Sequence, residues 1–248
     1  MSREKTLLFV IPVHNEEKNI ANSVSDIRNN FINADIKADI LAVDDFSEDN
    51  TVAVLESHGV NYLKLPANLG YSVAVQTGIL YAKRNNYDFV IQFDGDGQHL
   101  ASEATKLYEA IKSTDSNIVI GSRFLGNTGY KHPLFRRMGT KLFSFMIKVL
   151  TGKIITDPTS GFQILDKKTI EKYSEPGEYP EFPDANLIAK MILEGFIVSE
   201  VSCKMVERKD GVSMHAGIMK PIKYAIKCTY SLMLIGLFKI FGRKTKNV

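Results

Sequence analysis

Two aspartates separated by a single glycine, Asp94 and Asp96, follow an apolar run in this sequence. They belong to the segment FDGDGQH at residues 93–99, and glycines let a chain turn where other residues resist. Carboxylates that converge on such a turn repel each other unless a cation lies between them. The pattern favours a hard divalent cation, Mg²⁺ or Mn²⁺, holding a phosphate-bearing ligand. The alternative is an Asp- and Gly-rich turn without a ligand.

Strands and helices that would position this pair alternate along the chain. Apolar runs predict strands at 7–13, 40–43, 60–65, 89–93, 118–120 and 197–203. Helical spacing predicts helices at 48–58, 71–84, 101–112, 134–150 and 184–194, with a short strand and helix at 164–173. A first helix would have Asn15 as its cap and Glu16 and Glu17 in its first turn. This order predicts an α/β fold: a mostly parallel, Rossmann-like sheet flanked by helices on both faces.

Polar residues gather where these predicted strands end. Ligands of parallel sheets bind beyond the carboxyl ends of the strands, so clusters at these positions point to one shared site. The clusters are His14-Asn15-Glu16, Asp44-Asp45, Asn68 in the loop 66–70, Asp94 with Asp96, and Ser122-Arg123.

The composition excludes several classes of protein. A net charge of +3 is too small to indicate nucleic-acid binding. Cys203 and Cys228 are far apart, which suggests a reducing compartment and argues against a disulfide framework or a zinc site. The N-terminal apolar run is typical of a first strand rather than a signal peptide. No apolar run approaches the roughly 20 residues that span a bilayer, and no nucleotide-binding P-loop is present.

The chain is expected to form one domain over residues 1–217. Its first half, about 1–125, would hold a nucleotide, and its second half, about 126–217, would hold an acceptor. Residues 218–248 would form a basic, amphipathic C-terminal helix and tail.

An ordered set of motifs runs through residues 6 to about 215: PVHNEE, VDDFSEDNT, NLGYSVAVQTG, FDGDGQH, GSRF, DPTSGF and ERKDGVS. With these motifs the chain resembles the family 2 glycosyltransferases of GT-A fold, in particular the dolichyl- and polyprenyl-phosphate sugar transferases. The resemblance implies an inverting, metal-dependent transfer from a nucleotide-sugar, a GDP- or UDP-hexose.

The resemblance places a donor site in the first half of the chain. Asp94 and Asp96 would hold Mg²⁺ or Mn²⁺ with the help of Gln98. Asp44 would accept a hydrogen bond from the edge of the base, although Asp44-Asp45 could instead be a strand-to-helix capping turn. The other implied donor contacts are Pro12, His14, Glu16, Asp45, Asn68 and Gly70.

Arg123 and Arg208 are expected to meet the donor's diphosphate, because guanidinium groups bind phosphate oxygens bidentately and stay charged. In ERKDGVS, Gly211 would let the loop close and Ser213 would donate to a phosphate oxygen; the alternative is a charged surface loop. His215 is either a further metal contact or an ordinary surface or core histidine.

The acceptor decides whether a catalytic base is needed. A hydroxyl of a growing cell-surface polysaccharide must lose its proton to a carboxylate, whereas a lipid phosphate is already an anion. For a hydroxyl, Asp184 is the first candidate base, with Asp157 and Glu181 as alternatives; Asp184 could instead stabilise a helix start, and Asp157 could brace the DPTSGF turn. For a polyprenyl or dolichyl phosphate, the favourable residues are Lys131, Arg136, Arg137, Lys141 and Lys148. Asp96, Arg123, Arg208 and Asp184 form the expected catalytic set.

The tail carries lysines around the apolar stretch TYSLMLIGLF. It would lie in a membrane interface, or pack on the domain or on a second copy. The family often has transmembrane helices of its own, so a small membrane protein partner is a further expectation. These features suggest a cytoplasmic enzyme peripherally associated with the membrane. A different class of function, a non-catalytic nucleotide-sugar-binding partner of a membrane complex, also fits the motifs.

Overall fold

Strand β1 (Leu7–Val13) is buried on both faces of the central sheet, as its unbroken apolar sequence predicts. Leu7, Phe9 and Ile11 contribute to one hydrophobic cluster, and Leu8 and Val10 contribute to the other. This alternation follows from the two-residue period of a strand. The sheet therefore separates two cores, and both must be covered by helices.

The structure is a computed structural model that describes residues 6–33, 36–126, 134–206 and 219–241. The further strands are β2 (Ala38–Asp44), β3 (Asn61–Lys64), β4 (Phe89–Gln92), β5 (Ile118–Ser122), β6 (Gln163–Asp166) and β7 (Val198–Ser202). The helices are α1 (Ile20–Asn33), α2 (Thr51–Ser57), α3 (Tyr71–Arg84), α4 (Ala101–Ser113), α5 (Leu134–Thr151), α6 (Lys167–Tyr173), α7 (Ala185–Leu193) and α8 (Met219–Phe241).

The strand order across the sheet is β3-β2-β1-β4-β6-β5-β7. All neighbours pair in parallel except β6, which is antiparallel to both β4 and β5. The predicted mostly parallel sheet is thus confirmed, with a reversed strand near its middle. Because β1, β2, β4 and β5 run in one direction, the polar clusters that follow them meet at one edge of the sheet.

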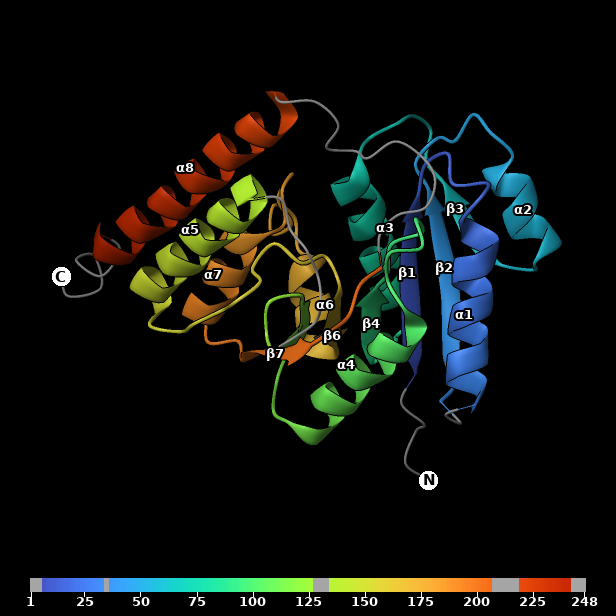
Figure 1. The fold of residues 1–248 in the computed structure, drawn as a ribbon, viewed down its shortest axis with the longest axis horizontal. Helices are drawn as coiled ribbons and strands as arrows, with labels where there is room; N and C mark the ends of the chain where they lie inside the picture. Colours follow the sequence, from blue (N-terminus) through green and yellow to red (C-terminus); the bar gives the residue numbers. More distant parts are fainter. Residues whose placement is uncertain (1–5, 34–35, 127–133, 207–218, 242–248) are drawn as a thin grey trace.

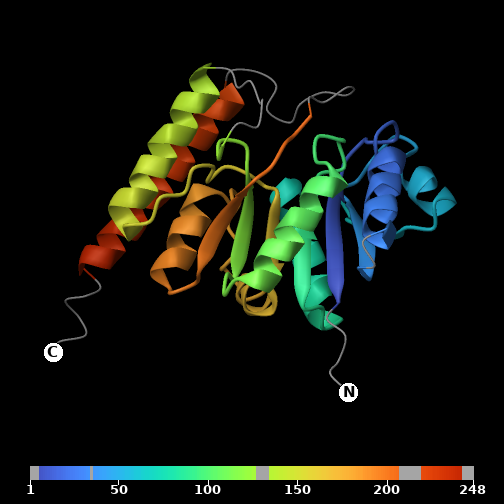
Figure 2. The ribbon, with the colours of Figure 1, turned by 60° about the horizontal axis from the view of Figure 1, so that its bottom comes forward.

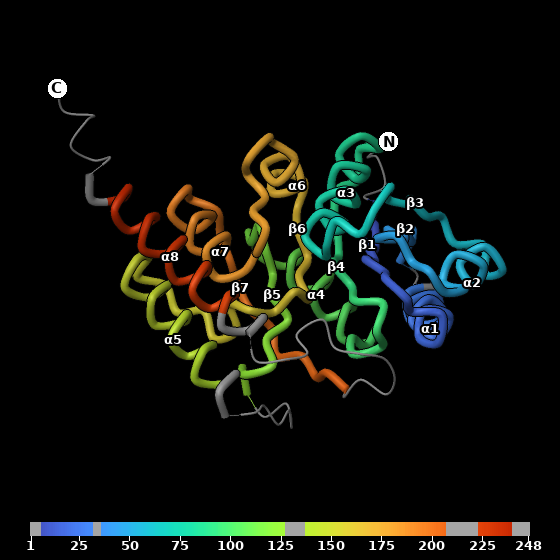
Figure 3. The backbone as a smooth tube through the Cα atoms, turned by 90° about the horizontal axis from the view of Figure 1, so that it is seen from above, coloured from blue at the N-terminus to red at the C-terminus, as the bar shows by residue number. Residues whose placement is uncertain are grey.

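Helices cover both faces of the sheet (Figure 1). Helices α1 and α4 pack against each other on one face. On the other face, α3 packs on β1 and β2, while α5, α7 and α8 form a layer beside the second half of the sheet (Figures 2 and 3). Strand β5 lies between β6 and β7, so the division into a nucleotide half and an acceptor half stays a prediction.

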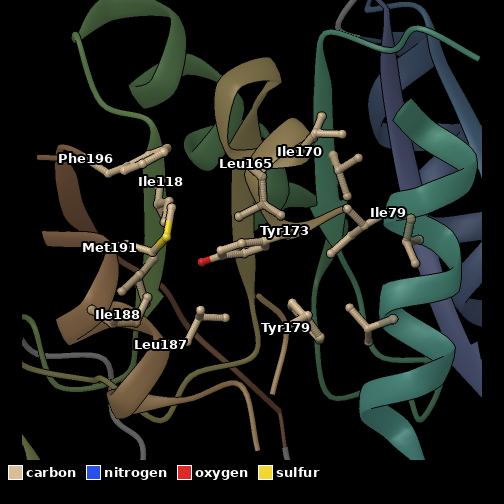
Figure 4. Close-up of a cluster of buried hydrophobic side chains, with 14 of the residues drawn as sticks. Ile79, Ile118, Leu165, Ile170, Tyr173, Tyr179, Leu187, Ile188, Met191 and Phe196 are labelled. Atoms are coloured by element: carbon tan, nitrogen blue, oxygen red, sulfur yellow. The ribbon is translucent and has the colours of Figure 1, made fainter. Parts of the chain in front are cut away.

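The core on the α3 face is centred on Tyr173, which lies between Ile79 of α3 and Ile188 of α7 (Figure 4). Helix α3 approaches β1 closely at Gly78, where an added Cβ would lie 2.2 Å from Val10 Cγ1. A glycine is therefore required at this helix–sheet contact.

Helix α8 packs on α5 and α7 through buried Cys228 and Leu232. The expected C-terminal helix is present, and its inner side belongs to the domain. Within the part of the chain that the structure describes, no helix combines the length and apolar character needed to cross a bilayer.

Candidate active site

The Asp94–Asp96 turn lies at the carboxyl end of β4, beside the end of β1. Gly95 packs against β1, where an added Cβ would lie 2.9 Å from Val13 Cγ1. Gly97 has a φ of 78°, which reverses the chain, and Asp96 Oδ1 accepts the backbone N–H of Gln98 at 3.0 Å. The glycines thus serve close packing and a left-handed turn, as the sequence indicates.

Asp94 is held by two side chains that the sequence analysis did not single out. The Tyr71 hydroxyl donates to Asp94 Oδ1 at 3.1 Å, and His99 Nδ1 accepts the backbone N–H of Asp94 at 2.9 Å. The His99 ring is buried and stacks on Phe162 of the DPTSGF turn, with centroids 4.4 Å apart. Burial lowers the pKa of His99 to about 4, although Asp96 opposes this shift; Arg123 adds to it. The imidazole is therefore neutral at pH 7.

Arg123 leaves the end of β5 and is fixed by Asp157. Its Nε and Nη2 donate to the two Asp157 carboxylate oxygens at 2.7 and 2.8 Å, and Nη2 also donates to Thr159 at 3.1 Å. Asp157 is fully buried, whereas the Arg123 side chain is 15% exposed. Asp157 therefore directs Arg123 toward the site, and the bracing role is the one that the structure supports for it.

Asp184 is the N-cap residue of α7, but its side chain makes no capping hydrogen bond. Burial raises its pKa to about 6; the Tyr224 hydroxyl and Arg123 oppose the rise, and Asp157 adds to it. The Asp184 side chain therefore does not cap α7 by a hydrogen bond, and its role as a base stays a prediction. Glu181, a further candidate base beside Asp157, is exposed and pairs with Lys227 at 2.6 Å.

His14, Asp45 and Asn68 form one hydrogen-bonded group at the ends of β1 and β2. His14 Nδ1 donates to the Asp45 carbonyl at 2.8 Å, and its Nε2 lies 3.1 Å from Asn68 Nδ2. The Asp45 carboxylate accepts the backbone N–H groups of Leu69 and Gly70 at 2.7 and 2.8 Å. Asp45 therefore shapes the loop that enters α3 and does not cap α2, the helix that follows β2.

Asp44 is fully buried at the end of β2 and accepts the backbone N–H of Ser47 at 3.1 Å through Oδ1. Its Oδ2 has no hydrogen-bond partner among the described residues, and Lys64 lies 3.9 Å away. A buried carboxylate oxygen without a hydrogen bond is costly, so a ligand N–H would satisfy it.

The prediction that Asn15 caps the first helix, α1, is wrong. The helix begins at Ile20, and Asn15 has a φ of 56°. Asn15 Oδ1 instead accepts the backbone N–H of Glu48 at 2.8 Å. Glu16 is buried where the loop after β1 contacts the loop before α2. Pro12 is partly exposed at the end of β1.

The remaining predicted site residues have few contacts with this group or lie outside the described residues. Gln98 Nε2 points toward the Val206 carbonyl at 3.5 Å, and Arg137 is exposed on α5. Arg208, Ser213, His215 and the Arg136 side chain lie outside the described residues.

Comparison with known proteins identifies the family. The pattern of the family described as "Glycosyl transferase family 2" matches residues 8–174, more than half of the chain. The chain is a family 2 glycosyltransferase. The expectations of an enzyme and of a GT-A fold are thereby confirmed.

Curated relatives of this glycosyltransferase extend over most of its length. The UDP-N-acetylglucosamine–dolichyl-phosphate N-acetylglucosaminyltransferase of Methanococcus voltae is 27% identical, covering 96% of this chain and 98% of the relative. The polyprenol monophosphomannose synthase of Mycolicibacterium smegmatis is 28% identical, covering 85% and 81%. The glycosyltransferase thus resembles the polyprenyl-phosphate sugar transferase branch.

Solved structures share the fold of the glycosyltransferase. Glucosyl-3-phosphoglycerate synthase from Mycobacterium tuberculosis, crystallised with Mn²⁺, UDP and phosphoglyceric acid, has a TM-score of 0.69 at 14% identity and covers 94% of this chain and 78% of its own. Mannosyl-3-phosphoglycerate synthase from Rubrobacter xylanophilus has a TM-score of 0.69 at 17% identity, covering 96% and 75%.

The acidic turn of the glycosyltransferase fits a divalent cation by its chemistry. Asp94 and Asp96 offer oxygen ligands, remain partly exposed, and follow one another on a single turn. Among the described residues, no group of three or more His, Cys, Asp or Glu side chains could hold a metal ion. Mg²⁺ is commonly bound by one or two carboxylates together with substrate phosphates, so two carboxylates suit a cation that arrives with a diphosphate.

Proposed function

We propose that this glycosyltransferase moves a hexose from a nucleoside diphosphate sugar to a polyprenyl phosphate, with inversion at the anomeric carbon. The observation that carries the proposal is the meeting, at one sheet edge, of the Asp94–Asp96 turn with the Arg123 guanidinium that Asp157 holds. A divalent cation held by the acidic pair, together with a fixed guanidinium, would stabilise the negative charge of a departing nucleoside diphosphate.

The donor would lie across the ends of β1, β2 and β4. Asp44 Oδ2 is available to the N–H edge of guanine or uracil, and the group of His14 and Asn68 would line the same pocket. A divalent cation, Mg²⁺ or Mn²⁺, bound at Asp94 and Asp96 would supply charge neutralisation to the diphosphate. Arg123, directed by Asp157, would contact the same diphosphate oxygens as the sugar leaves.

A lipid phosphate is favoured as the acceptor by charge and by the curated relatives. Helix α5 contains no acidic residue, and its Arg137, Lys141 and Lys148 are exposed. The two relatives described above are named for transfer to dolichyl phosphate and to a polyprenol. An acceptor that is already an anion can attack the anomeric carbon without a catalytic base.

Transfer to a sugar hydroxyl is the second candidate, and Asp184 is the observation that favours it. A carboxylate with a pKa of about 6 near Arg123 is suited to remove a hydroxyl proton. We also propose that the enzyme is cytoplasmic and associates peripherally with the membrane. A small membrane protein partner stays a prediction.

Radiolabelled UDP- and GDP-hexoses, incubated with the protein, Mn²⁺ and both a polyprenyl phosphate and a polysaccharide acceptor, test this function. The proposal expects one donor to yield label that extracts into organic solvent as a glycosyl phospholipid. It also expects Asp184→Asn to retain transfer within about tenfold, because a phosphate needs no base. Label that enters only a glycan, with a loss of about 10²–10⁴ in Asp184→Asn, would instead establish the hydroxyl acceptor.

A further inference from the structure

Helices α5 and α8 each carry a row of exposed apolar side chains. Both rows recur with three- and four-residue spacing, which places each row on one side of its helix. On α5 the row is Met138, Leu142, Phe145 and Val149, between 50% and 66% exposed. On α8 the row is Ile226, Tyr230, Met233 and Leu237, between 49% and 64% exposed.

The two rows form one continuous face. Phe143 in the middle of α5 contacts Tyr224 in the first half of α8, and Leu150 lies against Gly236 near the ends of both helices. The two helices therefore run side by side in the same direction (Figures 1 and 2). An α-helix turns by about 100° per residue. Val149, one residue before Leu150, and Leu237, one residue after Gly236, are therefore turned toward the same side of the pair.

This face is not part of the domain's core. The core-facing sides of the helices are formed by Phe143 and Ile147 on α5 and by Cys228 and Leu232 on α8, all buried. A shallow hollow on α8 is lined by residues that are mostly apolar, including Ile226, Tyr230 and Met233. Rows of this length that stay exposed after the domain has folded indicate a surface that meets another apolar phase.

Charge selects among the possible occupants. Neither α5 nor α8 contains an Asp or a Glu, although the chain has 28 acidic residues. Exposed Lys141, Lys148 and Lys223 flank the apolar rows. Two copies of such a face would bring like charges together, whereas an anionic bilayer attracts the lysines and accepts the apolar side chains.

We propose that the outer face of α5 and α8 docks on an anionic lipid surface and brings the active site to its acceptor. The inference rests on the proposed lipid-phosphate acceptor for its purpose, but the docking itself is independent of turnover. Both helices begin at the edge of the sheet where the site lies (Figure 1). Helix α8 is also joined to the segment before Asp184, by the Lys227–Glu181 ion pair and the Phe182–Tyr224 ring contact.

Vesicle co-flotation of the full chain tests the docking. Vesicles of phosphatidylglycerol and phosphatidylcholine are compared with vesicles of phosphatidylcholine alone. The wild type is expected to float with the anionic vesicles and to be released by high salt. Phe145→Asp and Met233→Asp should each weaken this partitioning by about tenfold or more, because each replaces an exposed apolar side chain that would enter the lipid with a carboxylate. Ile197→Asp is the matched control, since Ile197 is an exposed apolar residue outside both helices, and it should bind as the wild type does.

Unchanged flotation of Phe145→Asp and Met233→Asp would overturn the proposal. So would a wild-type dimer that these substitutions convert to monomer while lipid binding persists, because the face would then belong to a second copy. Failure of the proposed function is distinguishable: sugar transfer to a polyprenyl phosphate would be absent while flotation and its loss in the two variants remain.

Discussion

His99 contacts Asp94 in two ways: its Nδ1 accepts the Asp94 backbone N–H at 2.9 Å, and its Nε2 lies 3.5 Å from Asp94 Oδ2. Because Nδ1 is an acceptor and the ring is neutral, the proton is on Nε2, where it faces the carboxylate. Phe162 stacks on the same ring, so the DPTSGF turn supports the acidic turn through His99. A buried histidine thus orients a carboxylate that we expect to hold the cation.

Replacing His99 tests this orientation. His99→Phe keeps a ring in the slot but leaves the Asp94 N–H unsatisfied, which should cost about 1–3 kcal/mol of unfolding free energy. Mn²⁺ binding, measured by calorimetry, should also weaken. His58→Phe is the control, because His58 is exposed and bonds only locally on α2. Equal effects in both variants would argue against the orienting role.

The Arg123–Asp157 pair should be far more important for stability than an exposed pair. Asp157→Asn leaves a mostly buried guanidinium without its carboxylate and should cost about 3–5 kcal/mol. Glu181→Gln removes the exposed ion pair with Lys227 and should cost no more than about 1 kcal/mol. Urea unfolding of the two variants measures the difference, and similar losses would refute it.

The stability of the protein should depend on pH through Asp184. Its pKa is raised from an ordinary value of 3.8 to about 6, so the fold favours the protonated carboxyl. The contribution of Asp184 to stability is complete below pH 3.8 and is lost as pH rises through about 6. Above pH 7, Asp184→Asn should therefore melt about 2–6 °C higher than the wild type. Near pH 4 the two melting temperatures should converge; a constant difference across this range would contradict the shift.

Two helix glycines should respond in opposite directions to alanine. Gly78→Ala places a methyl group against Val10 in a closed helix–sheet contact and should cost about 1–3 kcal/mol or more. Gly139 on α5 has no atom within 4 Å of an added Cβ, so Gly139→Ala should gain up to about 1 kcal/mol in helix propensity. Denaturant unfolding compares them, and a neutral Gly78→Ala would show that β1 and α3 can separate.

Features that depend on local pattern could be predicted from the sequence. The acidic turn after β4 and Arg123 after β5 follow from apolar runs that end in polar residues, and parallel strands bring such ends to one edge. The terminal helix α8 follows from its apolar spacing. For the tail, the sequence left membrane docking and packing as alternatives. The proposal that the exposed apolar face continues onto α5 depends on the packing of the two helices.

Features that depend on distant partners could not be predicted. Strand β6 inserts antiparallel between β4 and β5, and a short apolar run does not indicate the direction of a strand or its neighbours in the sheet. Asn15 is a residue type that often caps helices, but its side chain instead accepts a hydrogen bond from the loop before α2. Tyr71 carries no local signal of its contact with Asp94, 23 residues away. His99 lies inside the FDGDGQH motif, but the motif does not indicate that its side chain is buried.

The central claim is that Asp94 and Asp96 hold a cation with the diphosphate of a nucleotide-sugar. Calorimetry of a panel of UDP- and GDP-hexoses, with Mn²⁺ and then with EDTA, tests it most directly in the wild type, in Asp96→Asn and in Asp115→Asn, an exposed control. One donor is expected to bind the wild type and Asp115→Asn only with Mn²⁺, and to bind Asp96→Asn at least about tenfold more weakly, as loss of a charged ligand requires. Equal donor binding with EDTA, or by Asp96→Asn, would contradict the claim.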